Sequence, residues 1–110
     1  MQTTFEKQRK YSRHRAPKGL FVGWRSAGQR DVSRAEVVGM GGLFLHVAAP
    51  PNVGTMIQLV LDLQTGEFRA RAVVRDSAPG KGMGVQFVQM DQEARARLNQ
   101  FLMQYLAPSS

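Results

Sequence analysis

Apolar and polar residues alternate along most of the chain after residue 17, with the period of two that is typical of β-strands. In GLFVGW, for example, Leu20, Val22 and Trp24 fall on one side. Turn-forming stretches such as SAGQ, AAPPNVG and SAPGKG separate these segments, and adjacent prolines forbid continued pairing. The pattern predicts six short strands, whose spacing is typical of a small barrel or sandwich. The segments are GLFVGW, RDVSRAEVVG, GLFLHV, TMIQLVLDL, EFRARAVVRD and MGVQFVQ.

The last three predicted strands differ in the faces that they bury. TMIQLVLDL is nearly continuous in apolar side chains, which predicts a strand buried on much of both faces. In the next strand Arg69, Arg71 and Arg75 alternate with apolar residues, so we expect a basic outward face. The inward positions of the last two strands are Phe68, Ala70, Ala72, Val74, Met83, Val85 and Phe87.

The apolar period changes to three and four near the end of the chain, which predicts one helix over about residues 91–106 that caps or leans on the barrel. Asp91 is a favourable N-cap residue and Pro108 ends the pattern. The apolar stripe of this helix consists of Ala94, Leu98, Phe101, Leu102, Tyr105 and Leu106.

Composition narrows the function classes. A length of 110 residues indicates one domain, and 15 Lys and Arg against 8 Asp and Glu give a net charge of +7. This charge favours phosphate-bearing or acidic partners, and it leaves nucleic acid, a nucleotide messenger, an anionic membrane surface and an acidic protein open. The N-terminus is polar and no apolar run approaches the ~20 residues of a spanning helix, so we expect a cytoplasmic domain without membrane insertion.

The sequence contains no residue pattern that predicts a catalytic or a metal-binding site. Cysteine is absent, and the two histidines, His14 and His46, lie in no motif with an oriented nucleophile or a zinc-ligand spacing. The glycine-rich stretches GMGG and GKGMG match neither a P-loop nor a dinucleotide fingerprint. We therefore expect no enzyme, no metal and no cofactor.

The first 17 residues carry few large apolar side chains and end at Pro17, which predicts a flexible basic arm. Within it, Arg9 and Arg13 have the spacing R-x-x-x-R, with Lys10 between them and Arg15 beyond. A guanidinium group can hold a phosphate or the edge of a guanine through two parallel hydrogen bonds, which the point charge of lysine cannot imitate. The arm is thus a candidate anion-binding element.

The order of these features along the chain resembles the PilZ domain, the bacterial receptor module for cyclic di-GMP. An R-x-x-x-R arm is followed by a strand, then by GGLFL about thirty residues later, and then by PPNVGTMIQLVLDL, RARAVVRD, GMGVQFV and the helix. The resemblance runs from about Arg9 to Leu106. It implies a mainly β fold, a six-stranded antiparallel barrel with a C-terminal helix over 18–107, preceded by the arm over 1–17.

The resemblance also implies a ligand site and a partner. Arg9 and Arg13 would close over the guanines and phosphates of cyclic di-GMP, with Lys10 as a helper. A downstream protein partner is expected, whereas nucleic acid is not. Oligomeric state, ligand stoichiometry and pathway stay open.

The second motif of the family, D/N-x-S-x-x-G, is degenerate in this chain. Aligned on the glycine pair, Val37 replaces the Asp or Asn, Gly39 replaces the Ser, and Gly42 keeps its place. Two lost hydrogen bonds would weaken binding by about 1 to 4 kcal/mol, or roughly fivefold to nearly a thousandfold. Backbone N–H groups around Gly39, Gly41 and Gly42 could offset part of this loss, so these glycines are predicted ligand residues.

An upstream stretch offers an alternative register for that motif. Asp31-Val32-Ser33 has the D-x-S start, although Glu36 then stands where the glycine belongs.

Three functional hypotheses follow. The first is a non-enzymatic cyclic di-GMP receptor whose R-x-x-x-R arm closes over the ligand. The second is a degenerate PilZ domain that has lost the messenger and acts as a protein interaction module in motility or envelope regulation. The third, nucleic-acid binding by Arg69, Arg71 and Arg75, is disfavoured because Trp24, Phe68 and Phe87 are predicted to point inward and cannot stack on bases.

Overall fold

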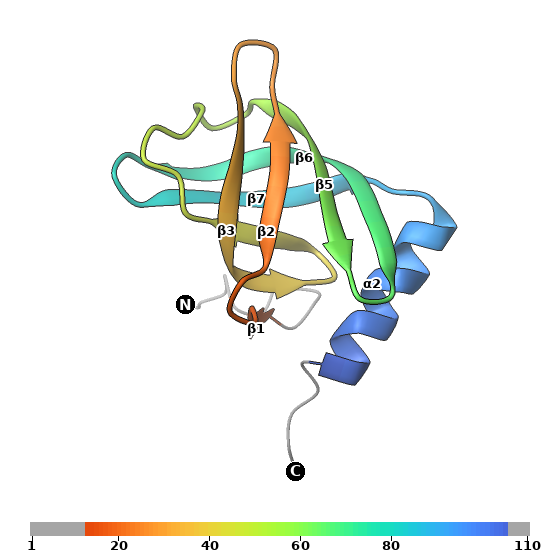
Figure 1. Cartoon of the computed structure of the whole chain (residues 1–110). Helices are drawn as coiled ribbons and strands as arrows, with labels where there is room; N and C mark the ends of the chain where they lie inside the picture. Colours follow the sequence, from red (N-terminus) through yellow and green to blue (C-terminus); the bar gives the residue numbers. More distant parts are fainter. Residues whose placement is uncertain (1–12, 106–110) are drawn as a thin grey trace, which may run out of the picture.

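The computed structural model describes residues 13–105, with side chains as far as residue 104. Within these residues seven strands come first and one helix follows (Figure 1). The elements are β1 (Arg13–Arg15), β2 (Phe21–Arg25), β3 (Arg30–Gly39), β4 (Gly42–Leu45), β5 (Met56–Leu63), β6 (Gly66–Ala78), β7 (Gly82–Gln89) and α2 (Gln92–Tyr105).

Six of the strands close into an antiparallel barrel, as predicted. The hydrogen-bonded order is β3-β2-β5-β6-β7-β4, and β4 returns to pair with β3, which closes the ring. The long strand β3 makes this possible, because its first half pairs with β2 and its second half pairs with β4. The turn between β2 and β3 projects from one end of the barrel (Figure 1).

The seventh strand, β1, lies within the stretch that was predicted to be a flexible arm. It pairs antiparallel with the second half of β3, from Arg13 opposite Gly39 to Arg15 opposite Val37. The N–H of Ala16 then donates to the carbonyl of Glu36 at 2.8 Å. Arg13–Arg15 therefore belongs to the sheet, because the free edge of β3 supplies backbone hydrogen bonds that no side-chain pattern predicts. The flexibility of the arm over 1–17 stays a prediction. Arg9 and Lys10 lie outside the described residues.

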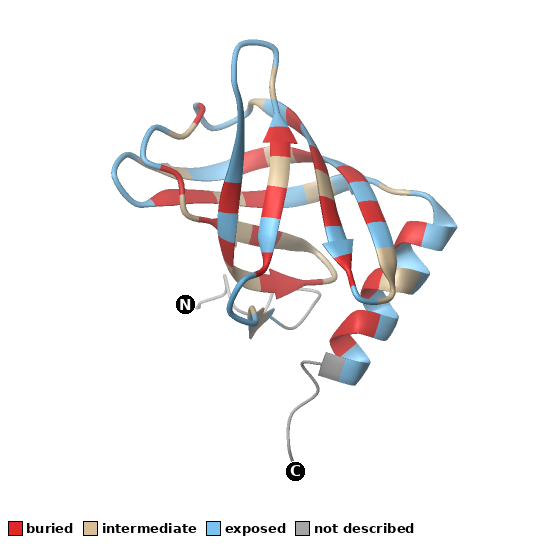
Figure 2. Cartoon of the chain, viewed as in Figure 1, coloured by how far each residue is buried: buried red, intermediate tan, exposed pale blue. Residues whose placement is uncertain are grey.

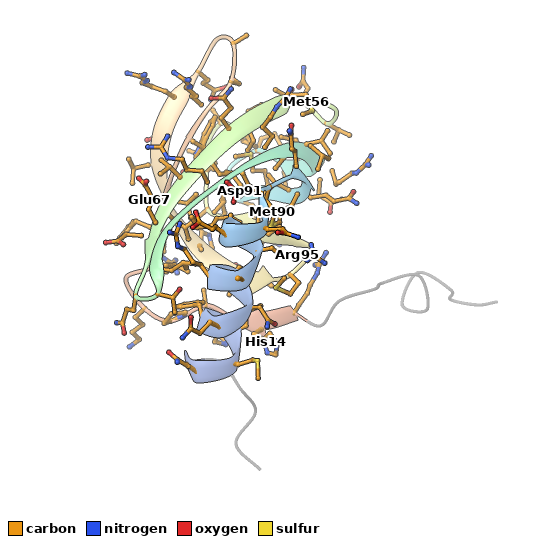
Figure 3. All side chains as sticks on the ribbon, turned by 90° about the vertical axis from the view of Figure 1, so that its right-hand side faces the viewer. His14, Met56, Glu67, Met90, Asp91 and Arg95 are labelled. Carbon is orange, nitrogen blue, oxygen red and sulfur yellow. The ribbon has the colours of Figure 1, made fainter. Side chains whose placement is uncertain are left out.

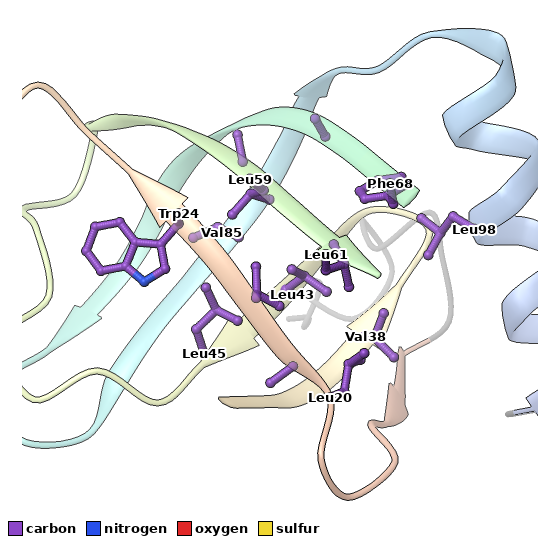
Figure 4. Close-up of a cluster of buried hydrophobic side chains, with 14 of the residues drawn as sticks. Leu20, Trp24, Val38, Leu43, Leu45, Leu59, Leu61, Phe68, Val85 and Leu98 are labelled. Atoms are coloured by element: carbon purple, nitrogen blue, oxygen red, sulfur yellow. The ribbon is translucent and has the colours of Figure 1, made fainter. Parts of the chain in front are cut away.

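The core fills the inside of the barrel and continues beneath the helix. Buried and exposed residues alternate along the strands (Figure 2), and the buried side chains converge from all of the barrel strands (Figure 4). Among the predicted inward positions of β6 and β7, six are buried and Phe87 is half-buried. Phe87 packs against Phe68, with ring centroids 5.4 Å apart.

Strand β5 corrects one prediction. Its apolar run indicated burial on both faces, but burial alternates along the strand: Ile57, Leu59, Leu61 and Leu63 are buried. Met56, in contrast, is 42% exposed. A barrel wall has a single inner face, and the outer face of most of β5 is left uncovered in this fold.

Helix α2 begins as predicted, directly after Asp91, whose Oδ1 accepts a hydrogen bond from the N–H of Ala94 at 2.7 Å (Figure 3). Its buried residues Leu98, Phe101 and Leu102 join the core. Arg97 ties the helix to the start of β6, because its guanidinium donates to the carbonyl of Glu67 at 2.9 Å. The predicted stripe positions Tyr105 and Leu106 lie outside the residues whose side chains are described. No helix in residues 13–105 is both long and apolar enough to cross a bilayer.

Candidate functional site

The pairing of β1 with β3 places two arginines on the outer surface of the barrel. Residues that face each other in an antiparallel pair share one side of the sheet. Arg13, opposite Gly39, and Arg15, opposite Val37, are both exposed, whereas His14 pairs with Val38 on the buried side. The structure thus brings the predicted ligand residues Arg13 and Gly39 together.

Arg15 is a candidate site residue that the sequence pattern did not select. The R-x-x-x-R spacing selects Arg9 and Arg13, and Arg15 lies outside this motif as a further cation. A strand predicted over Arg13–Arg15 would have identified Arg15, because side chains two residues apart in a strand lie on the same face. Once Arg13–Arg15 is known to be a strand, both arginines must lie on one side of it.

The surface beside these arginines is partly apolar. The register of β3 against β4 shifts between Ala35 and Val37, a β-bulge, so that Glu36 and Val37 are both partly exposed between buried neighbours. Val37 faces Phe44 across the ladder. The position where the family motif has Asp or Asn is therefore occupied by an aliphatic side chain next to a half-buried aromatic ring.

Polar groups reappear next to this apolar pair. His46 Nε2 lies 3.0 Å from Oε1 of Glu36, and the two side chains are 35% and 45% exposed. The imidazole also meets the ring of Phe44 edge-on, with centroids 6.0 Å apart. A ligand bound over Val37 would thus find a hydrogen-bonding pair on one side and two guanidinium groups on the other.

The glycines of GMGG have different roles in the structure. Gly42 is needed for packing, because a Cβ added there would collide with the backbone carbonyl of Val85 on β7. The carbonyl of Gly41 accepts a hydrogen bond from the N–H of Phe87 at 2.9 Å. Gly39 is buried at the end of β3, opposite Arg13. Steric need therefore explains the glycine at 42 without a ligand, and ligand contact by all three stays a prediction.

The alternative register on Asp31-Val32-Ser33 is ruled out by the direction of its serine. Ser33 is only 5% exposed and points into the barrel, where its Oγ accepts a hydrogen bond from the indole N–H of Trp24 at 2.9 Å. Asp31 Oδ1 accepts from the N–H of Val32 at 2.7 Å. Because the Ser33 side chain lies inside the barrel and is hydrogen-bonded to Trp24, it cannot contact a ligand on the outer surface.

No group of three or more His, Cys, Asp or Glu side chains that could hold a metal ion occurs among residues 13–104. Trp24 and Phe68 point inward, as predicted, and are only 3% and 0% exposed, so they cannot stack on bases.

Comparison with known proteins identifies relatives of this architecture. A family model described as the PilZ domain matches residues 7–104. Comparison with curated protein sequences gives no match. Solved structures that share the fold include the following three.

The first of these is the inhibitor of motility (MotI/DgrA) from Bacillus subtilis, with 19% identity and a TM-score of 0.73 over 94% of this chain and 54% of that one. The second is K. pneumonia MrkH in complex with c-di-GMP, with 16% identity and a TM-score of 0.73 over 90% of this chain and 52% of that one. The third is the PilZ domain of YcgR from Escherichia coli with c-di-GMP, with 16% identity and a TM-score of 0.65 over 87% and 89%. The chain spans about half the length of MotI and MrkH.

Proposed function

Because this chain belongs to the PilZ domain family, we propose that it is a non-enzymatic receptor that binds cyclic di-GMP between its N-terminal arginines and the outer face of β3 and β4. The observation that carries this proposal is the β1–β3 register, which places Arg13 opposite Gly39 and Arg15 opposite Val37. Two of the similar solved structures, MrkH and the PilZ domain of YcgR, contain the same messenger.

The two guanidinium groups suit a ligand with two phosphates and two guanines. Neither Arg13 nor Arg15 forms an ion pair with another described residue, so their charge is not already neutralised there. Their planar forks match both a phosphate and the O6/N7 edge of guanine. Arg9 and Lys10 would add to this grip from the part of the arm that precedes β1.

The barrel side of the site lowers the expected affinity. Val37 and Gly39 offer no side-chain hydrogen bond, which lowers the expected affinity by about fivefold to nearly a thousandfold relative to a site with Asn and Ser. Arg15 and the Glu36–His46 pair supply polar contacts near the same position. We therefore propose a receptor of reduced affinity whose binding depends mainly on the arginines and weakens as salt is added.

Calorimetric titration with cyclic di-GMP tests this proposal. Arg13→Ala should weaken binding by about tenfold to a hundredfold, because a charged hydrogen bond contributes ~1.5–3 kcal/mol. The matched control is Arg71→Ala, which removes an exposed strand arginine from β6 and should change the Kd by less than about twofold. Absence of binding at high micromolar ligand, or equal losses in both variants, would defeat the proposal.

A second candidate function follows from the apolar pair at the centre of the site. Val37 faces Phe44 where a ligand would need polar atoms, which favours a domain that has lost the messenger and binds a protein instead. The double variant Val37→Asn, Gly39→Ser decides between the two functions. Gly39 is not among the glycines with positive φ, so serine fits its backbone. If cyclic di-GMP binds only the double variant, the native domain is the interaction module.

A further inference from the structure

A second basic surface lies on other strands of the barrel. The registers place Arg25 opposite Arg30 and Gln58, Gln58 opposite Arg71, and Arg71 opposite Gln89. These five residues form one row across β3, β2, β5, β6 and β7, and all of them are exposed. The row spans four strand spacings, about 19 Å, which is the length of roughly six residues of an extended chain.

Two of the three arginines of this row are oriented by hydrogen bonds that leave their charge intact. Arg25 donates from Nε and a terminal nitrogen to Oε1 of Gln58, at 3.1 and 2.9 Å. Arg71 donates to Oε1 of Gln89 at 3.1 Å. An amide oxygen orients a guanidinium but carries no charge, so the positive potential of the row persists. Arg25, Arg30 and Arg71 form no ion pair within the described part of the chain.

The row lines a groove of about 970 Å³ on the outer face of β2, β3, β5 and β6. Gly23 and Val60, which face each other on β2 and β5, supply a bare backbone and an aliphatic side chain. Val32, opposite Gly23 on β3, is 65% exposed. The groove therefore combines an apolar strip with a line of cations, which is the pattern of a peptide-binding surface.

We propose that this groove binds an extended acidic segment of a partner protein, in which Glu or Asp residues alternate with aliphatic residues. The carboxylates would pair with the arginines of the row, and the aliphatic side chains would cover Val32, Gly23 and Val60. This surface does not include β1 or β4, so the inference does not depend on cyclic di-GMP binding.

A peptide fits the groove better than a nucleic acid does. The aromatic residue that lines it, Trp24, is 3% exposed and offers no platform for a base. Asp31 and Asp91 also line the groove and would repel a continuous phosphate backbone. A peptide can place aliphatic residues beside these carboxylates and its acidic residues beside the arginines.

Fluorescence anisotropy with a fluorescein-labelled peptide of four Glu-Val repeats tests the proposal on the full chain. The double variant Arg25→Gln, Arg71→Gln should weaken binding by tenfold or more, which corresponds to at least about 1.4 kcal/mol. The control Arg13→Gln, Arg15→Gln removes the same charge from β1 and should change the peptide Kd by less than about twofold. When cyclic di-GMP is titrated into the same two double variants, only the β1 variant should lose affinity. The peptide proposal and the cyclic di-GMP proposal can therefore fail independently of each other.

Four outcomes would overturn the proposal. The first is that the Glu-Val peptide fails to bind the protein at several hundred micromolar. The second is that the protein binds a Lys-Val peptide of the same length equally well. Equal losses in the two double variants would show a general effect of net charge. Tight binding of labelled oligothymidylate through Arg25 and Arg71, without peptide binding, would make the groove a nucleic-acid surface.

Discussion

Replacement of Ser33 by alanine tests the buried hydrogen bond between Ser33 and Trp24 inside the barrel. Trp24 and Ser33 are 3% and 5% exposed, and the indole N–H donates to Ser33 Oγ at 2.9 Å. Among the described residues, no buried side-chain nitrogen or oxygen lacks a hydrogen-bond partner. Ser33→Ala would create one, because the methyl group cannot accept from the indole.

The expected loss follows from that unpaired donor. A buried polar group without a partner costs about 1–3 kcal/mol, so we expect the free energy of unfolding to fall by about 2 kcal/mol. For a domain of this size, this corresponds to a decrease in Tm of roughly 8–16 °C. Urea unfolding followed by far-UV circular dichroism measures the change, and the emission of Trp24, the single tryptophan, reports on the same transition.

A double-mutant cycle with Trp24→Phe checks the cause. With phenylalanine at 24 there is no indole donor to leave unpaired, so Ser33→Ala should then cost less than about 1 kcal/mol. An equal cost in both backgrounds would refute the hydrogen bond as the reason. The Kd for cyclic di-GMP should stay within about twofold in Ser33→Ala, and a tenfold loss would restore Asp31-Val32-Ser33 as a ligand motif.

Two further substitutions test how the elements are held together. Gly42→Ala should lower the free energy of unfolding by about 3 kcal/mol, because the added Cβ meets the rigid carbonyl of Val85; Gly28→Ala, with nothing within 4 Å, should change it by less than about 0.5 kcal/mol in the same urea titration. Arg97→Ala should lower the free energy of unfolding by about 1 kcal/mol, because the helix loses its 2.9 Å hydrogen bond to Glu67 at the start of β6. The exposed Gln100→Ala on the same helix is its control, and equal thermal shifts in the two variants would contradict the role of this bond.

Local sequence patterns determined much of the fold. The alternation in GLFVGW and EFRARAVVRD predicted which side chains point into the barrel, because a strand changes face at every residue. Asp91 marked the start of the helix, because capping depends on residues only three apart. The basic N-terminal stretch and the order of its neighbours led to the family. All of these signals extend over a few residues and need no partner strand.

The tertiary structure decided everything that depends on register between distant strands. The pairing of Arg13–Arg15 with β3 brought Arg15 over Val37, and the same kind of pairing aligned Arg25, Gln58 and Arg71 from three separate strands. Closure of the barrel turned Ser33 inward and left one face of β5 uncovered. Backbone hydrogen bonds and packing across the whole barrel select these alignments, and the alternation within any one strand is compatible with several of them.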